Sequence, residues 1–100
     1  MSIETLEGYV IDIACVRKVP RQDLLNRAKE HSRDCTLMGH CIESGFALVD
    51  DSDRLSLLDS EATAKILHAV ETSHQDRGIR LRVQRKLEGD EARTQQVEAI

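Results

Sequence analysis

Thiol and imidazole side chains gather in one stretch of this chain of 100 residues. His31, Cys35, His40 and Cys41 lie within residues 31–41, and the third cysteine, Cys15, precedes them. Three thiolates and one imidazole form a Cys3His set, which suits tetrahedral zinc because the ion accepts soft sulfur and borderline nitrogen ligands. The sequence therefore predicts a zinc site held by Cys15, His31, Cys35 and Cys41.

Other ions suit the same donors. Copper(I) is the main competitor of zinc because it also prefers soft ligands, and Met38 offers an additional thioether. An iron–sulfur centre is the third possibility. Structural zinc sites fill all four positions with protein ligands and leave none for water, so we expect no enzyme activity from such a site.

The cysteines also allow a redox interpretation. An odd number of cysteines excludes a closed set of internal disulfides, and a reducing compartment would keep them as thiols. Cys35 and Cys41 could instead form a reversible disulfide in a redox module or sensor, with His31 lowering the pKa of a thiol. The sequence leaves this second function open.

Composition limits the partners. The chain is long enough for one domain, residues 1–100, and its hydrophobic fraction of 40% is adequate for a globular core. An aromatic fraction of 2% and a net charge of −4 disfavour nucleic acid, which needs basic grooves or stacking rings. The chain has no signal segment and no apolar run near the ~20 residues of a membrane span, so we expect a cytoplasmic protein without membrane contact.

The elements before the cluster should bring its members together. Residues 8–16 alternate with period two and predict a strand with Cys15 on its core face. Residues 21–32 predict a helix with His31 on its apolar stripe. Asp12 lies on the opposite face of the strand from Cys15, where it is either exposed or hydrogen-bonded to the insertion between the first two strands.

The rest of the chain predicts four strands and a second helix. A hairpin covers residues 46–50 and 54–58, a helix runs from Ser60 to about Gln75, and strands follow at 79–87 and 94–100. This order is typical of a small five-stranded barrel of the oligonucleotide/oligosaccharide-binding (OB) type, mainly β with two helices (α+β), with a helical insertion after strand 1 and a helix between strands 3 and 4. An open α+β sheet is the alternative. One common core is predicted, comprising Tyr9, Ile11, Ile13, Phe46, Leu48, Leu55, Leu57, Ile66, Val70, Leu81 and Val83.

The spacing of these residues resembles that of a known group of proteins. The patterns Gly8-x3-Asp12-x2-Cys15 and His31-x3-Cys35-x5-Cys41-x3-Gly45 are similar to those of small bacterial proteins of uncharacterised function with an expected OB-like fold. The resemblance covers nearly the whole chain. It implies the fold and the four-residue site, and it brings no established activity.

A third function remains beside metal binding and thiol redox chemistry. Arg80, Arg82, Arg85 and Lys86 place a basic stripe on the fourth strand. An OB-type module could use this stripe to bind a protein or nucleic acid, with the cysteines only stabilising the fold. Such stripes are usually solvated faces that also discourage edge pairing, and the sequence identifies no protein partner.

Overall fold

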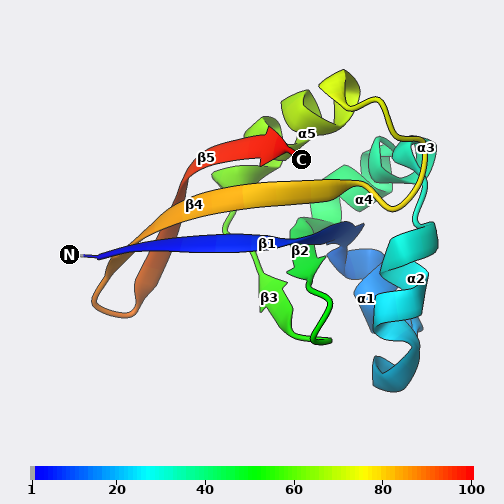
Figure 1. The fold of residues 1–100 in the computed structure, drawn as a ribbon, viewed down its shortest axis with the longest axis horizontal. Coiled ribbons are helices and arrows are strands. Elements are labelled where there is room, and N and C mark those ends of the chain that lie inside the picture. Colours follow the sequence, from blue (N-terminus) through cyan, green and yellow to red (C-terminus); the bar gives the residue numbers. More distant parts are fainter. Residues whose placement is uncertain (1) are drawn as a thin grey trace.

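The computed structural model describes residues 2–100 and forms one antiparallel sheet with helices packed against it (Figure 1). In chain order the elements are β1 (Ser2–Asp12), α1 (Ile13–Lys18), the 3-10 helix η1 (Arg21–Asp23), α2 (Leu24–Glu30), α3 (Arg33–Thr36), α4 (Gly39–Ser44), β2 (Phe46–Val49), β3 (Leu55–Leu57), α5 (Ala62–Thr72), β4 (Arg80–Glu88) and β5 (Glu91–Ala99).

The sheet has the strand order β3-β2-β1-β4-β5, with every neighbouring pair antiparallel. β1 is the central strand: its residues 9–12 pair with β2 and its residues 2–9 pair with β4. The five predicted strands and the helix between strands 3 and 4 are confirmed. Within residues 2–100 no ladder joins β3 to β5, so the sheet is open and closure into a barrel is not established.

The prediction of two helices was wrong. The segment between β1 and β2, residues 13–45, contains four short α-helices and η1 instead of one longer helix, and α5 brings the number of α-helices among the described residues to five. Pro20 separates α1 from the next helices because its ring fixes φ and removes a backbone donor. We call residues 13–45 the insertion.

The first strand ends earlier than its alternating pattern predicts. Asp12 has an extended backbone, and its Oδ2 accepts a hydrogen bond of 2.9 Å from the Cys15 amide, so it caps α1. The predicted strand over residues 8–16 was therefore wrong beyond Asp12. Cys15 lies in the first turn of α1 rather than on a strand face.

The core is divided between the two faces of the sheet, so the single predicted core was wrong. On one face α5 packs against the strands through Val10, Phe46, Ile66 and Leu81. On the other face the insertion packs through a second group: Ile11, Leu24, Ala28, Ala47 and Val49. Adjacent residues of β1 point to opposite faces, which is why Val10 and Ile11 belong to different groups. Leu57, predicted to be in the core, is 58% exposed.

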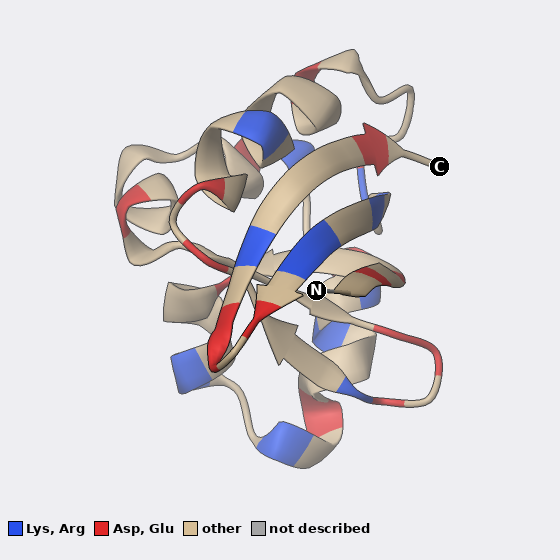
Figure 2. Ribbon diagram, turned by 90° about the vertical axis from the view of Figure 1, so that its left-hand side faces the viewer, with Lys and Arg blue, Asp and Glu red and all other residues tan. Residues whose placement is uncertain are grey.

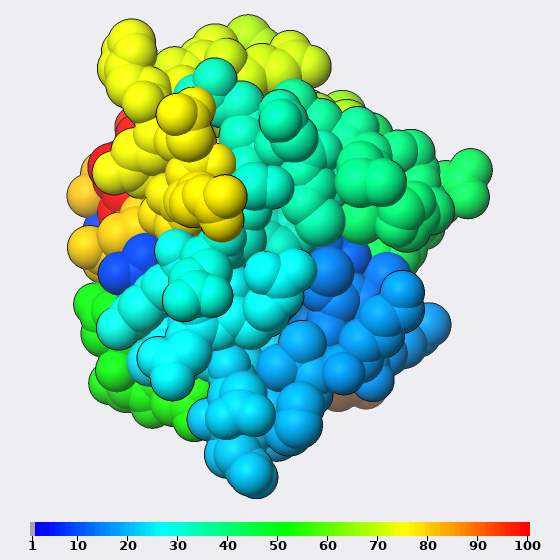
Figure 3. Space-filling model, turned by 90° about the vertical axis from the view of Figure 1, so that its right-hand side faces the viewer, coloured from blue at the N-terminus to red at the C-terminus, as the bar shows by residue number. Residues whose placement is uncertain are grey.

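The loop that follows α5 packs against the insertion. The Gly78 amide donates to the His31 carbonyl at 3.1 Å, and the Arg33 amide donates to the Asp76 carbonyl at 2.8 Å. Arg33 also reaches the carbonyls of Ser73 and Gln75 with its guanidinium. Figure 3 shows this loop, in yellow, lying against the cyan segment of the insertion. The backbone around His31 is thereby held by a segment that is distant in the sequence.

Candidate metal centre

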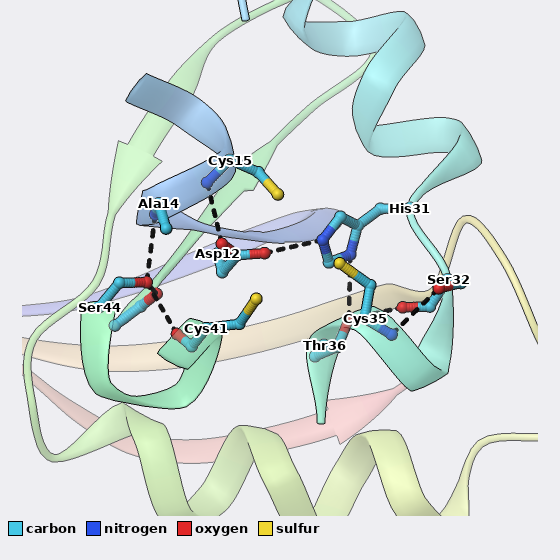
Figure 4. Close-up of polar contacts among 10 residues, drawn as sticks. Asp12, Ala14, Cys15, His31, Ser32, Cys35, Thr36, Cys41 and Ser44 are labelled. Carbon is cyan, nitrogen blue, oxygen red and sulfur yellow. Dashed lines mark hydrogen bonds and ion pairs between the residues drawn. The ribbon is translucent and has the colours of Figure 1, made fainter. Parts of the chain in front are cut away.

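Four possible ligand atoms converge where β1 ends and the insertion begins. Asp12, Cys15, His31 and Cys35 each offer one such atom, and all four atoms lie within 4.8 Å of one another. They come from the end of β1, the first turn of α1, the residue after α2 and the first turn of α3. Figure 4 shows these side chains directed toward one shared region.

The same kind of helix cap positions two of the cysteines. Asp12 caps α1 and accepts from the amide of Cys15, three residues later. Ser32 caps α3 and accepts from the amide of Cys35, also three residues later, at 3.0 Å. Both cysteines therefore lie in the first turn of a short capped helix. Both are only partly buried. The cap fixes the backbone of each cysteine, which sets the direction of its side chain.

Asp12 is fully buried and connects the cap to the histidine. Its Oδ1 lies 2.8 Å from His31 Nε2, while Oδ2 holds the Cys15 amide. Burial alone would raise the pKa of this carboxyl group. The hydrogen bonds from His31 and Cys15 outweigh burial and hold the pKa well below its usual range, so Asp12 is a carboxylate.

His31 is held at both ring nitrogens. It is 1% exposed, its Nε2 faces Asp12, and its Nδ1 lies 3.0 Å from Thr36 Oγ1. The Thr36 hydroxyl also donates to the Ser32 carbonyl at 3.0 Å. A metal-binding histidine usually directs its second nitrogen to an acceptor that fixes the ring. Thr36 is such a group.

Cys41, the fourth predicted ligand, lies beside this set but is not among the four atoms within 4.8 Å. It is buried in α4, and the Ser44 hydroxyl ties this helix to α1 by donating to the Cys41 carbonyl and accepting from the Ala14 amide. Burial raises the pKa of the Cys41 thiol to about 12, and the neighbouring Asp12 and Cys35 add to the shift. The structure thus groups three of the predicted residues, and the role of Cys41 as a ligand stays a prediction.

The thiols of Cys15 and Cys41 are not suited to act as low-pKa nucleophiles. Burial raises the pKa of the Cys15 thiol to about 12, and the Asp12 carboxylate reinforces the effect. Together with the same shift at Cys41, this is the opposite of the lowered pKa that a redox-active thiol requires. All three cysteines are free. A bound cation would reverse this effect, because it stabilises the thiolate directly.

Two members of the site were missed or left undecided from sequence. Asp12 was expected to be either exposed or bonded to the insertion, and the structure shows the bond, to His31. Thr36 was not singled out. The spacing Asp-x-x-Cys and Ser-x-x-Cys, with a capping residue three positions before each cysteine, is the signal that predicts these short helices.

The remaining candidate residues lie away from the centre. Met38, considered as an additional thioether ligand for copper(I), is 47% exposed. His40 is exposed in α4. His68 and His74 are exposed on α5 and in the loop after it. None of these residues belongs to the group of converging donors.

The basic stripe on β4 is paired with acidic side chains. Figure 2 shows its blue segments beside red ones on the neighbouring strands. The ion pairs along the stripe are Arg80 with Asp51, Arg82 with Glu7 and Glu98, Arg85 with Glu4, and Lys86 with Glu88. This pairing leaves little of the stripe for an anionic ligand. No helix among residues 2–100 combines the length and apolar character needed to cross a membrane.

Comparison with known proteins gives a short similarity. The chain is 42% identical over 60 residues to the mannose-1-phosphate guanylyltransferase regulatory subunit alpha of Dictyostelium discoideum. The match covers 60% of this chain and 13% of that protein. No family model matches the chain, and no solved structure matches it.

Proposed function

We propose that this chain is a small metal-binding protein whose ion is held by Asp12, Cys15, His31 and Cys35, with zinc as the preferred metal. The observation that carries the proposal is the convergence of four donor atoms within 4.8 Å. These donors come from separate elements, and two of them are completely or almost completely buried. A buried carboxylate, a buried imidazole and two thiols need either a shared ion or a dense network of hydrogen bonds.

The donor set favours zinc over the alternatives. Two sulfurs, one nitrogen and one carboxylate oxygen are all ordinary zinc ligands, and zinc accepts them in one tetrahedron. Copper(I) prefers softer sets, and here one donor is the hard oxygen of Asp12. An iron–sulfur cluster is held by thiolates, and only two of the four grouped donors are sulfurs.

Charge favours Asp12 over Cys41 as the fourth ligand. Zinc with two thiolates and one carboxylate carries a net charge of −1. A third thiolate from Cys41 beside an ionised Asp12 would make the buried site −2, at a larger desolvation cost. We therefore propose that Cys41 stays a neutral thiol next to the ion. With four protein ligands there is no open position for water, so the proposed role is structural or metal-handling rather than catalytic.

Two further observations concern the fold and a second candidate function. The sheet order and the helix between β3 and β4 support an OB-like fold. The short match to a regulatory subunit favours a second candidate function, contact with a protein partner. Metal binding ranks first because it depends on residues of this chain in a defined geometry.

A zinc titration under reducing conditions, with a chromophoric chelator as competitor, tests the proposal. Wild-type protein should take up one zinc ion per chain. Cys35→Ser should lose most of this binding because a hydroxyl is a poor ligand for zinc, whereas His68→Ala should behave as wild type because His68 is exposed on α5. Fully reduced wild-type protein that binds no zinc would rule out the proposed function.

A further inference from the structure

A buried threonine contacts one ring nitrogen of the histidine in the proposed metal site. Thr36 is fully buried at the end of α3, and its Oγ1 lies 3.0 Å from His31 Nδ1. The same oxygen donates to the Ser32 carbonyl at 3.0 Å. The two contacts place one hydroxyl between the imidazole and a fixed backbone carbonyl.

We infer that Thr36 is the positioning residue that makes Nε2 the metal-binding nitrogen of His31. This inference rests on the proposed metal site. A neutral imidazole carries one proton, so a ring that binds an ion through Nε2 must carry its proton on Nδ1. Thr36 Oγ1 accepts a hydrogen bond from that N–H and donates its own proton to the Ser32 carbonyl, so every donor in the chain of contacts has an acceptor.

The surroundings leave Nε2 as the nitrogen that faces the donors. Nε2 lies 2.8 Å from Oδ1 of Asp12, which is one of the other three donor residues. The backbone of His31 cannot shift to compensate for a change of ring orientation, because the Gly78 amide holds its carbonyl and the Ala28 carbonyl accepts from its amide. Rotation of the ring about its side-chain bonds is therefore limited by Asp12 on one edge and Thr36 on the other.

The substitution Thr36→Val tests this role because it keeps the shape and removes the hydroxyl. Groups that orient a metal-binding histidine typically contribute 10–100-fold to affinity, so zinc binding by Thr36→Val should weaken by about 10- to 100-fold. Thr36→Ser restores the hydroxyl and should bind within about 3-fold of wild type on the same reasoning.

Thr94→Val is the matched control. Thr94 is also buried, and its hydroxyl on β5 donates at 2.6 Å to Asp59, in the loop between β3 and α5. Its loss should lower the free energy of unfolding, as the loss at Thr36 does, but should leave zinc affinity unchanged. Circular dichroism and melting of each metal-free variant establish that the proteins compared are folded.

Two spectroscopic readouts separate positioning from general stability. Long-range proton–nitrogen NMR of the zinc-loaded wild type should show Nδ1 protonated and Nε2 bound to the metal. The visible ligand-field bands of the cobalt(II) form should be the same in Thr36→Ser and wild type and should change in Thr36→Val. Coordination through Nδ1 in wild type, or equal affinity and equal bands in Thr36→Val, would overturn the inference while leaving the metal site in place. Wild type that binds neither zinc nor cobalt(II) would overturn both.

Discussion

Asp12 is the residue on which most of the site depends. It caps α1 with one oxygen and meets His31 with the other, and it adds to the effect of burial in raising the pKa of two neighbouring thiols, Cys15 and Cys41. Its carboxylate is buried, and a buried polar group left without its hydrogen-bond partner costs about 1–3 kcal/mol. A single carboxyl group therefore links the local structure of the insertion to the electrostatics of the site.

The first prediction concerns Asp12→Asn in metal-free protein. Because the folded-state pKa of Asp12 lies below its usual value of 3.8, the ionised carboxylate stabilises the fold above about pH 4, and this contribution is lost as the pH falls below that value. Asparagine can still cap α1 but has no charge. Asp12→Asn should therefore be less stable than wild type at pH 7, and its stability should depend less on pH between about 4 and 2.

Urea unfolding at pH 7 and pH 3 measures this difference. Asp34→Asn is the control, because Asp34 lies in the first turn of α3, outside the group of converging donors, and should keep the wild-type pH dependence. An equal loss of stability on acidification in Asp12→Asn and wild type would show that the ionised Asp12 carboxylate does not stabilise the fold.

Cys41 provides the second prediction at this scale. If Asp12 is the fourth ligand, Cys41→Ser should still bind one zinc ion per chain, and Cys15→Ser should not. Equilibrium dialysis of both variants, folded as judged by circular dichroism, distinguishes the two ligand sets. Loss of zinc by Cys41→Ser would instead support the Cys3His set that the sequence predicts and exclude Asp12 as the necessary fourth ligand.

Several of the site residues could be predicted from sequence alone, and others could not. Cys15, His31 and Cys35 were found because thiol and imidazole side chains are rare and were spaced unusually. Asp12 was ambiguous because a carboxylate on an alternating strand is normally exposed. Thr36 was missed because its role depends on its contacts with His31 and Ser32, which become clear only when α3 is seen to start at Arg33.

At the scale of elements, a helix cap ends β1 although the alternating pattern of apolar residues continues beyond it. Tyr9, Ile11 and Ile13 continue the alternation of a strand, yet the backbone turns helical after Asp12 because that side chain satisfies the Cys15 amide. Alternation over a few residues does not distinguish a strand from a short helix at its end. The last four strands and α5 were predicted to within three residues of their ends. β1 was not, because it begins at Ser2 and ends at Asp12, and the helices of four to seven residues in the insertion were not predicted separately.

The contact between the loop after α5 and the insertion provides the third prediction. Gly78 has φ of +57°, and a Cβ at this position would lie 2.6 Å from the Lys29 carbonyl oxygen. Gly78→Ala should therefore displace the backbone that holds His31. Gly89 has nearly the same φ, +58°, and a Cβ there would meet no atom within 4 Å, so Gly89→Ala isolates the cost of the backbone conformation.

We expect Gly89→Ala to lose about 1–2 kcal/mol of unfolding free energy from the left-handed conformation alone. Gly78→Ala should lose more and should also weaken zinc binding, which Gly89→Ala should leave unchanged. Denaturant unfolding and zinc competition measure the two effects. Equal stability and equal zinc affinity in the two variants would show that the loop does not position His31.

At the scale of the whole molecule, the insertion and the sheet meet at the proposed ion. β1 is the central strand, and its last residue, Asp12, is also the first ligand. The second core group attaches the insertion to one face of the sheet through Ile11 and Leu24. The proposed site begins at Asp12, the residue that follows Ile11 at the end of β1. The overall order of strands followed from the sequence, but the openness of the sheet and the division of the core depend on how strands twist and pair over long distances, which a local pattern does not record.

Elemental analysis of the purified protein is the most direct test of the central claim. The chain should be produced without a polyhistidine tag and without added metal, kept reduced, and compared with Cys35→Ser prepared in parallel. The account predicts close to one zinc ion per wild-type chain and almost none in Cys35→Ser. Wild-type protein that contains no zinc and takes up none on titration, or a Cys35→Ser variant with the same zinc content as wild type, would contradict it.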